Sequence, residues 1–306
     1  MVLVSILVFS VLRLLPGDPA LARVGSARNV SPQAIAHLRH VYGLDRSIAR
    51  QYVIWVTHLL HGDLGRSFLS DYPVSRLLAQ GLGPTVELAL SGLLLGVVLA
   101  LVVAVAPVLW PKRLISQIVS SYTTLGMAAP PFVYGIILIA VFSVWLRVLP
   151  NVGYVSFANH PLQSLKYVAM PAVTLGIAVS APLVRYLRAS LQEALMAPYV
   201  RTAQGKGLSH RRVVLVHALP NALLPSLTVL GVMVGSLLGG VVVVEYVFRW
   251  PGLGSIIVNA VVQRDYSLLQ AAVLLAAAAF IGVNLLVDLS YGLLDPRLRI
   301  GRGIQK

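Results

Sequence analysis

Long runs of apolar residues, separated by short basic or proline- and glycine-containing segments, place the strongest constraint on how this chain can fold. The 306 residues are 58% hydrophobic and only 11% charged, and their mean hydropathy is +0.84. Soluble globular domains contain about 25% charged residues. Because a helix of about 20 apolar residues crosses the hydrocarbon core of a bilayer, the composition predicts a polytopic, all-α membrane protein.

Five of these runs are long enough to cross a bilayer, and a shorter run precedes them. Residues 1–15 would form only about 22 Å of helix, so we expect the first transmembrane helix to need residues upstream of Met1. A secretory signal peptide cleaved near Ala22 is the alternative, but no basic segment precedes the apolar run. We therefore expect six transmembrane helices, at residues 1–15, 84–110, 118–146, 166–187, 223–244 and 268–291.

Prolines and glycines distinguish two of these spans. Pro130 and Pro131 remove adjacent backbone donors, so we expect their span to be kinked or broken against neighbouring helices or a pathway. Glycines four residues apart form a smooth stripe in the fifth span, against which another helix can pack closely. That helix could belong to a second subunit or to the same chain. The stripe consists of Gly231, Gly235 and Gly239.

Residues 193–220 form a basic, helix-forming interruption of the apolar second half. Pro198 suits a first helical turn and Gly207 a left-handed cap, so residues 199–206 predict a two-turn helix. Ser209 is placed to cap a second short helix that ends at Leu219, and prolines at 220 and 225 are expected to bend or restart the chain. Two short helices joined at a glycine predict a docking feature.

Residues 16–83 are mixed in character and predict a small extracytoplasmic helical segment. Helices are expected at 32–42, capped by Ser31, and at 48–60, followed by a turn at 62–67. Histidine pairs spaced three apart could each share a helix face as metal ligands. Because no carboxylate is visibly organised around them, we favour solvated or packed histidines. The pairs are His37 with His40 and His58 with His61.

The distribution of lysine and arginine predicts the orientation and accounts for the net charge of +14. Basic residues collect in cytoplasmic loops, and those of this chain lie between spans without interleaved aromatics, which disfavours nucleic-acid binding. With both termini cytoplasmic, twelve basic residues lie in the inner loops or at the inner end of a span, where Arg185 is counted, and four lie in the short outer loops or at the outer end of a span, where Lys166 is counted. The other eight lie in or beside the long translocated segment, where this rule has little force. The segment 193–220 is therefore expected inside.

No catalytic constellation is visible in the sequence. Residues 205–207 lack the G-x-x-x-x-G-K-[ST] frame that cradles phosphate, and no metalloprotease or serine-hydrolase motif is present. An intramembrane protease is therefore disfavoured, and we expect no catalytic residue, cofactor or metal. A proton-coupled symporter remains the rival transporter class. Asn284 and Asp288 share a face of the last span, but a carboxylate satisfied near the helix end is the favoured interpretation for Asp288.

The segment 193–220 resembles the cytoplasmic coupling loop, or EAA loop, of ABC importer permeases. In that loop a glycine is followed thirteen residues later by the proline of a Leu-Pro pair, and Gly207 and Pro220 match this spacing. Residues 199–208 are similar to the form found in dipeptide, oligopeptide and nickel permeases, with Arg201 where most other permeases have glutamate. Residues 14–20, 244–254 and 295–299 resemble further motifs of this family.

The resemblance implies a type I ABC importer permease fold, with a core domain at 84–299 and a cytoplasmic tail at 300–306. It implies the B-type subunit of a peptide importer in the cytoplasmic membrane of a bacterium or archaeon. Nickel complexes, glutathione or haem are the alternative substrates. The implied partners are a second homologous permease, two cytoplasmic ATPases that bind ATP and Mg²⁺, an extracytoplasmic solute-binding protein, and membrane lipid.

The resemblance also assigns roles to residues. The chemistry of proline and glycine, independently of the resemblance, predicts that Pro130, Pro131 and the glycine stripe serve helix packing or the pathway. The residues expected to couple to the ATPases are Tyr199, Arg201, Thr202, Ala203, Lys206, Gly207 and Leu208.

Overall fold

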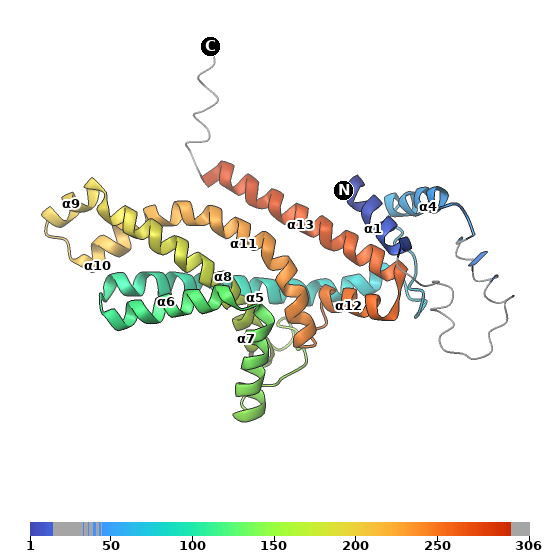
Figure 1. Ribbon diagram of the computed structural model, residues 1–306, viewed down its shortest axis with the longest axis horizontal. Helices are drawn as coiled ribbons and strands as arrows, with labels where there is room; N and C mark the ends of the chain where they lie inside the picture. Colours follow the sequence, from blue (N-terminus) through green and yellow to red (C-terminus); the bar gives the residue numbers. More distant parts are fainter. Residues whose placement is uncertain (15–32, 34–35, 37–38, 41–42, 44, 295–306) are drawn as a thin grey trace, which may run out of the picture. The chain divides into compact units, whose positions relative to one another are not determined.

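The computed structural model describes residues 1–14, 33, 36, 39, 40, 43 and 45–294 (Figure 1). Within these residues the regular elements are helices, and one isolated bridge pairs Arg66 with Pro73. The helix expected at 32–42 and the motifs expected at 14–20 and 295–299 lie largely or wholly outside the described residues, as does the tail at 300–306.

The described elements are α1 Val2–Leu14, α4 Ile48–Leu60, α5 Val74–Leu109, α6 Arg113–Ala128, α7 Pro131–Leu138, the π-helix η1 Ile139–Trp145, α8 Pro161–Met196, α9 Pro198–Gly205, α10 His210–Arg212, the π-helix η2 Val213–Ala218, α11 Leu219–Val247, α12 Leu253–Gln263 and α13 Tyr266–Leu294.

The chain divides into two compact units. The first contains Met1–Thr85 and Pro251–Ala279, and the second contains Val86–Trp250 and Phe280–Lys306. Helices α5 and α13 each contribute residues to both units. The elements at 193–220 and the proline pair at 130–131 both belong to the second unit.

The described residues contain four helices that are long and apolar enough to cross a membrane. They are Val74–Leu109, Pro161–Met196, His210–Val247 and Tyr266–Val287, and the bent pair α6 and α7–η1 supplies a fifth if it counts as one span. Helix α1 has only 13 residues. The expected count of six is therefore not confirmed, although the all-α membrane fold is.

Several span boundaries differ from the sequence prediction. Helix α5 begins ten residues before Pro84, because its first turns bury Val74 and Leu78 in the core of the first unit and this packing carries the helix through the proline. Helix α6 begins at Arg113 rather than 118, and α8 at Pro161 rather than 166. The apolar helix α12 was not predicted, because its 11 residues are too few to suggest a span.

The proline pair breaks its span, as predicted. Ala129 and Pro130 are extended, Pro131 occupies the first turn of α7, and the two halves of the span meet at 110°. Helix α7 therefore runs in a different direction from α6 (Figure 1). Because proline lacks a backbone donor and its ring clashes with the preceding turn, two consecutive prolines end one helix and begin another.

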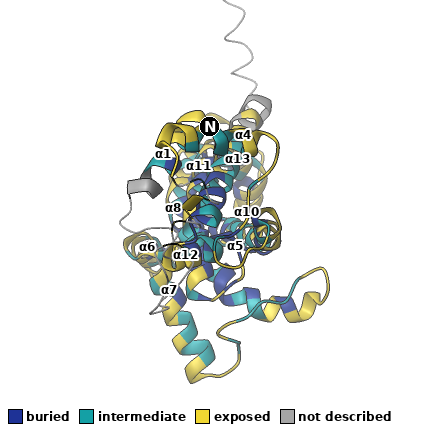
Figure 2. Cartoon of the chain, turned by 90° about the vertical axis from the view of Figure 1, so that its right-hand side faces the viewer, coloured by how far each residue is buried: buried dark blue, intermediate teal, exposed yellow. Residues whose placement is uncertain are grey.

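Helix α8 is the central element of the second unit. Of its most apolar 18 residues, 67% are buried, compared with 33% or less in the other three long spans (Figure 2). Glycines of α5 allow this burial, because a Cβ atom on Gly92 would lie 2.6 Å from Cβ of Leu175. On α6, a Cβ atom on Gly126 would lie 2.5 Å from Cβ of Ala181. Because these glycines have no side chains, the backbones of α5 and α6 can lie close to α8.

A carboxylate on α5 is held by two hydroxyl groups of the second unit. Tyr154 donates a hydrogen bond of 2.9 Å to one oxygen of Glu87, and Ser164 donates one of 2.8 Å to the other. Tyr154 also packs edge-on against the buried ring of Trp250 at 4.9 Å between centroids. These contacts join α5, the loop before α8 and Trp250, which lies within the segment 244–254 that resembles a family motif.

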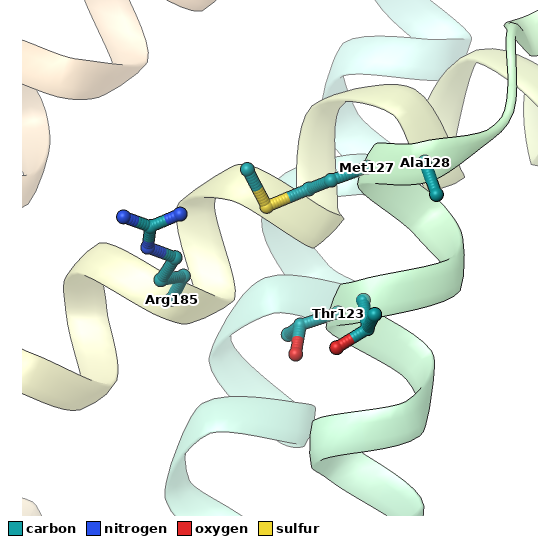
Figure 3. A pocket seen from close by; sticks show the side chains of 5 residues that line it. Thr123, Met127, Ala128 and Arg185 are labelled. Carbon is teal, nitrogen blue, oxygen red and sulfur yellow. The ribbon is translucent and has the colours of Figure 1, made fainter.

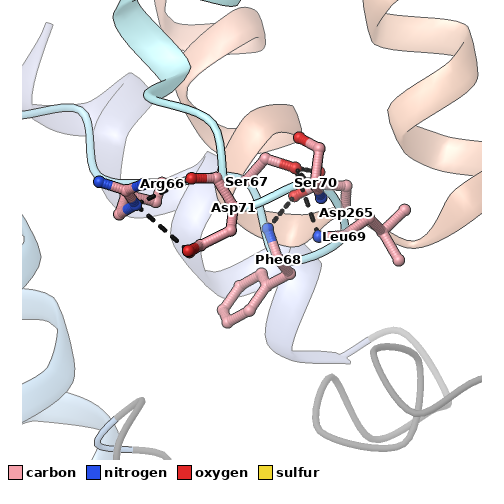
Figure 4. Close-up of polar contacts among 7 residues, drawn as sticks. All are labelled: Arg66, Ser67, Phe68, Leu69, Ser70, Asp71 and Asp265. Atoms are coloured by element: carbon pink, nitrogen blue, oxygen red, sulfur yellow. Dashed lines mark hydrogen bonds and ion pairs between the residues drawn. The ribbon is translucent and has the colours of Figure 1, made fainter.

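A buried aspartate organises the first unit. Asp265 precedes α13 and accepts hydrogen bonds from the Leu268 amide at 3.2 Å, the Phe68 amide at 3.1 Å and the Ser67 hydroxyl (Figure 4). The Ser67 oxygen in turn accepts from the amide of Ser70 at 3.1 Å. A single carboxylate therefore caps a helix and fixes the loop that follows the predicted turn at 62–67.

Two histidines of the segment 16–83 pair with carboxylates. His40 contacts Asp45 at 2.8 Å, His58 contacts Asp63 at 3.0 Å, and the Gly65 amide together with His58 lowers the pKa of the Asp63 carboxyl. The expectation that no carboxylate is organised around these histidines was wrong, because each of the two pairs with an aspartate five residues later. Their side chains remain exposed. No metal-binding cluster of three or more such residues occurs in the described part of the chain, and the histidine at 37 lies outside it.

The α5–α8 contact generates a stability prediction with a control on α11. A Cβ atom on Gly96 would lie 2.8 Å from Cβ of Val179 and 3.1 Å from the Gly176 carbonyl oxygen, whereas nothing lies within 4 Å of one on Gly239. Gly96→Ala should lower the free energy of unfolding by about 1–3 kcal/mol. Gly239→Ala should raise it by about 0.5–1 kcal/mol. Thermal unfolding in detergent micelles measures both, and equal midpoints for the two variants would contradict close packing at Gly96.

Candidate functional site

The coupling segment, residues 193–220, joins the end of α8 to the start of α11 (Figure 1). Helix α9 lies within it, as predicted: Ala197 is extended, and Pro198 occupies the first turn. Proline at this position costs nothing, because the first amides of a helix have no intrahelical acceptor. The helix is two turns long and ends at Gly205.

The end of α9 is a Schellman motif centred on Gly207. This glycine has φ of +77°, its amide donates to Gln204 at 2.9 Å, and the Leu208 amide donates to Ala203 at 3.4 Å. Leu208 and Ala203 also pack in one apolar cluster, which completes the motif. Because non-glycine residues avoid positive φ, Gly207 sets the direction of the chain after α9.

One face of α9 is buried and the other is exposed. Val200 and Ala203 pack against the fully buried Val213, with Leu208 partly buried beside them. Of the seven residues predicted to couple, Ala203 and Leu208 thus serve this internal packing. The others lie at the surface: Tyr199, Arg201, Thr202, Lys206 and Gly207.

The second part of the segment differs from the prediction. Ser209 precedes α10 without a side-chain capping bond, and no short helix ends at Leu219. Instead α10, η2 and α11 form one helix from His210 to Val247, and neither Pro220 nor Pro225 interrupts it. The π-helix η2 lies directly before Pro220, where a wider turn relieves the clash between the proline ring and the preceding carbonyl groups.

Contacts with the end of α5 hold the coupling segment in place. Nε2 of His210 lies 3.0 Å from the carbonyl oxygen of Val108, and the Arg211 guanidinium lies 5.9 Å from the centre of the Trp110 ring. Buried residues of η2 also pack against the end of α8 at Leu191. No sequence pattern indicated the contacts with α5, because His210 and Val108 lie 102 residues apart.

The exposed surface of the segment is strongly basic. Arg201, Lys206, Arg211 and Arg212 are exposed, and Glu193 is the only acidic residue between 193 and 220. A basic surface on a short, rigidly mounted helix suits an acidic partner surface.

The glycine stripe of α11 divides between two environments. A Cβ atom on Gly235 would lie 2.7 Å from Oδ1 of Asn284 on α13, so this glycine serves packing within the chain. Gly231 is also buried, whereas Gly239 is exposed and nothing lies within 4 Å of a Cβ atom placed on it. The prolines at 130 and 131 lie at the break between α6 and α7, and α7 packs against both α8 and α11.

Long apolar helices, two of which are joined by a packed segment with a basic surface, define the chain as a polytopic membrane protein. Comparison with known proteins identifies the family. The profile described as "Binding-protein-dependent transport system inner membrane component" matches residues 92–300, and that of its N-terminal domain matches residues 1–89. The chain belongs to this family of ABC importer permeases, which are multi-pass proteins of the inner membrane.

Curated relatives match almost the whole chain. The "Glutathione transport system permease protein GsiC" of Salmonella choleraesuis (strain SC-B67) is 38% identical over 299 residues, which cover 98% of this chain and 94% of the relative. The protein of the same name from Escherichia coli (strain K12) is 38% identical over 297 residues, which cover 97% and 94%.

A solved structure shares the fold at lower identity. It is the crystal structure of an amino acid ABC transporter with histidines, which aligns with a TM-score of 0.53 at 18% identity. The alignment covers 71% of this chain and 94% of that chain.

Two glycines of the coupling segment allow a test of its backbone geometry. Nothing lies within 4 Å of a Cβ atom on Gly205 or Gly207, but only Gly207 has positive φ. Gly207→Ala should destabilise the segment by about 1–2 kcal/mol, because an L-residue is strained there. Gly205→Ala should stabilise α9 slightly. Hydrogen exchange of the amides of residues 200–208 measures the difference, and equal protection in both variants would contradict the Schellman assignment.

Proposed function

We propose that this chain is the B-type permease subunit of an ATP-driven importer of peptides. The observation that carries the proposal is the exposed basic face of α9, which packs against α8 and η2. The named relatives transport glutathione, which is itself a tripeptide, so a small peptide or glutathione is the substrate class best supported. Nickel complexes and haem are the remaining alternatives within the family.

The packing of the coupling segment suggests how ATP hydrolysis drives transport. Two cytoplasmic ATPases, which bind ATP and Mg²⁺, contact α9 of this chain and of a second, homologous permease. When the ATPases close, they displace α9, and the displacement passes into α8 and α11 because η2 packs against α8 at Leu191. Interlocked helices move as rigid bodies rather than bending.

The remaining parts of the proposed assembly follow from the orientation. With both termini cytoplasmic, the coupling segment lies inside the cell, and an extracytoplasmic solute-binding protein delivers the solute to the outer surface. The break between α6 and α7 lies beside α8, so a shift of α8 changes the environment of the pathway. Membrane lipid covers the apolar faces of the spans.

The coupling role is tested by activity of the assembled complex. Gly207→Val should abolish substrate-stimulated ATP hydrolysis, because a β-branched residue cannot hold the positive φ, whereas Gly205→Ala should retain it. Arg201→Glu should keep α9 folded but lower the activity about threefold to thirtyfold, through loss of about 0.7–2 kcal/mol of charge pairing at a partly exposed contact. Normal transport by an assembled Gly207→Val complex would rule out a coupling role.

The proposed orientation is tested by labelling. The chain contains no cysteine, so single cysteines can be introduced at the exposed positions Ser47, Ser70 and Ser209. The cysteines at 47 and 70 should react with a membrane-impermeant maleimide in intact cells, and the cysteine at 209 should react only after permeabilisation. The reverse pattern would invert the topology.

The substrate class is tested with the complex in proteoliposomes. ATP-dependent uptake of glutathione, tri-alanine and a nickel complex should be compared at equal concentration of the loaded solute-binding protein. We expect uptake of at least one of the two peptides. Uptake of the nickel complex alone would overturn the peptide assignment.

The chain purified without its partner subunits should not hydrolyse ATP.

A further inference from the structure

A cavity of about 340 Å³ lies on the second unit between α6 and α8 (Figure 3). It is lined by Thr123, Thr124, Met127, Ala128 and Arg185. Arg185 reaches it from α8, and Met127 extends from α6 toward the part of α8 that carries Arg185 (Figure 3). The cavity lies at the end of α6, directly before the break at Pro130. Its volume falls within the range typical of small-molecule sites, about 300–1,000 Å³.

Two hydrogen-bond donors in this cavity have no partner in the described part of the chain. The Arg185 guanidinium makes no hydrogen bond or ion pair there, and neither does the Thr124 hydroxyl. Both residues are exposed on this chain, so a solute can reach them. The neighbouring groups are satisfied. Thr123 donates to the Ser120 carbonyl at 2.9 Å, and Arg188, one turn along α8, contacts the Ser120 hydroxyl at 3.5 Å.

The cavity lies well along the helix pair from its ends. Thr123 is ten residues from the start of α6 and Arg185 eleven residues from the end of α8, which place both about 15 Å along their helices. Those two helix ends lie on the side of the coupling segment, because His210 binds Val108 just before α6. The helices are held at this level by the Gly126–Ala181 contact and by the hydrogen bond between Tyr122 and Ser180.

An arginine on a membrane-spanning helix is costly unless it faces water or binds an anion, and Arg185 is exposed on this chain without a partner among the described residues. Its planar guanidinium presents paired donors that match a carboxylate, and the Thr124 hydroxyl, which lines the same cavity, offers another donor. None of the described residues that line the cavity is acidic. The chemistry therefore favours a carboxylate supplied from outside the chain, and peptides carry one at their C-terminus.

We propose that Arg185 and Thr124 bind the carboxylate of the transported solute as it passes the break between α6 and α7. The proposal rests on the proposed peptide importer function and assigns a solute site to it. The phosphate of an anionic lipid and an acidic residue of the second permease are the competing anions, and the experiment separates them from the solute.

The test uses a cysteine introduced at Ala128 in this cysteine-free chain, within the complex assembled with its partner subunits. The rate of its modification by an uncharged maleimide is measured with tri-alanine and with tri-alanine amide, in nanodiscs of phosphatidylcholine. Tri-alanine should slow the reaction and its amide should not. Arg185→Gln should raise the concentration of tri-alanine that gives half-maximal protection about tenfold or more, because a charge-assisted hydrogen bond is lost.

Two further variants make the result specific. Arg188→Gln removes the same charge one turn away, outside the cavity, and should leave the protection unchanged. Thr124→Val preserves the shape of the side chain and should weaken the protection, which keeps the proposal testable if Arg185→Gln does not assemble. Equal protection by tri-alanine and its amide, no protection by either, or unchanged protection in both Arg185→Gln and Thr124→Val would overturn the proposal.

The competing anions give different results. Slower labelling in phosphatidylglycerol nanodiscs without peptide, dependent on Arg185, would assign the site to lipid and overturn the proposal. Loss of the second permease from the purified Arg185→Gln complex, with unchanged protection in Thr124→Val, would assign Arg185 to the subunit interface and overturn it as well. A complex that imports tri-alanine with no dependence on Arg185 or Thr124 would refute only this site, whereas a complex that imports no peptide would refute the proposed function.

Discussion

Helix α8 lies so close to α5 and α6 that a side chain at Gly92, Gly96 or Gly126 would overlap its atoms. In a bilayer there is little hydrophobic gain from bringing two apolar helices together, so close contact between backbones must supply much of the attraction. The glycines provide that contact, and α8 becomes the most buried of the long spans. The coupling segment and the cavity beside the proline break both depend on α8 for their position.

The coupling segment makes more packing and hydrogen-bond contacts than a simple connection between two spans requires. Its Schellman motif fixes the chain after α9, its apolar side packs on Val213, and His210 and Arg211 hold it to the end of α5. The continuous helix from His210 to Val247 then joins it to α11 without a flexible break. Packed contacts therefore connect the coupling segment to α5, α8 and α11.

Carboxylates that anchor the two units are matched to hydrogen-bond donors. Glu87 accepts hydrogen bonds from two hydroxyls, and Asp265 caps α13 while holding the loop at 67–70. Desolvation makes such pairing necessary, since a buried charge without a partner is costly. Arg185 differs from these carboxylates, because it lines the cavity between α6 and α8 and has no partner in the described part of the chain. The proposed site for a solute carboxylate is based on this difference.

Local chemistry in the sequence determined the membrane class, the break at Pro130 and Pro131, and the helix from Pro198 to Gly205 with its cap at Gly207. Each depends on a short stretch of chain: apolar length, missing backbone donors, or a residue that tolerates positive φ. The family motifs are also short and local, and they alone indicated an ABC importer permease, which the family comparison confirms. The roles predicted for individual coupling and pathway residues remain predictions.

Tertiary packing decided the helix boundaries and the long-range contacts that the sequence did not predict. It carried α5 through Pro84 because Val74 and Leu78 are buried in the first unit, and it kept one helix running past Pro220 and Pro225. It also divided α9 into a buried and an exposed face, placed His210 on Val108, and brought Arg185 to the end of α6. These contacts join residues up to about a hundred positions apart, so they depend on how the helices pack and leave no local pattern in the sequence.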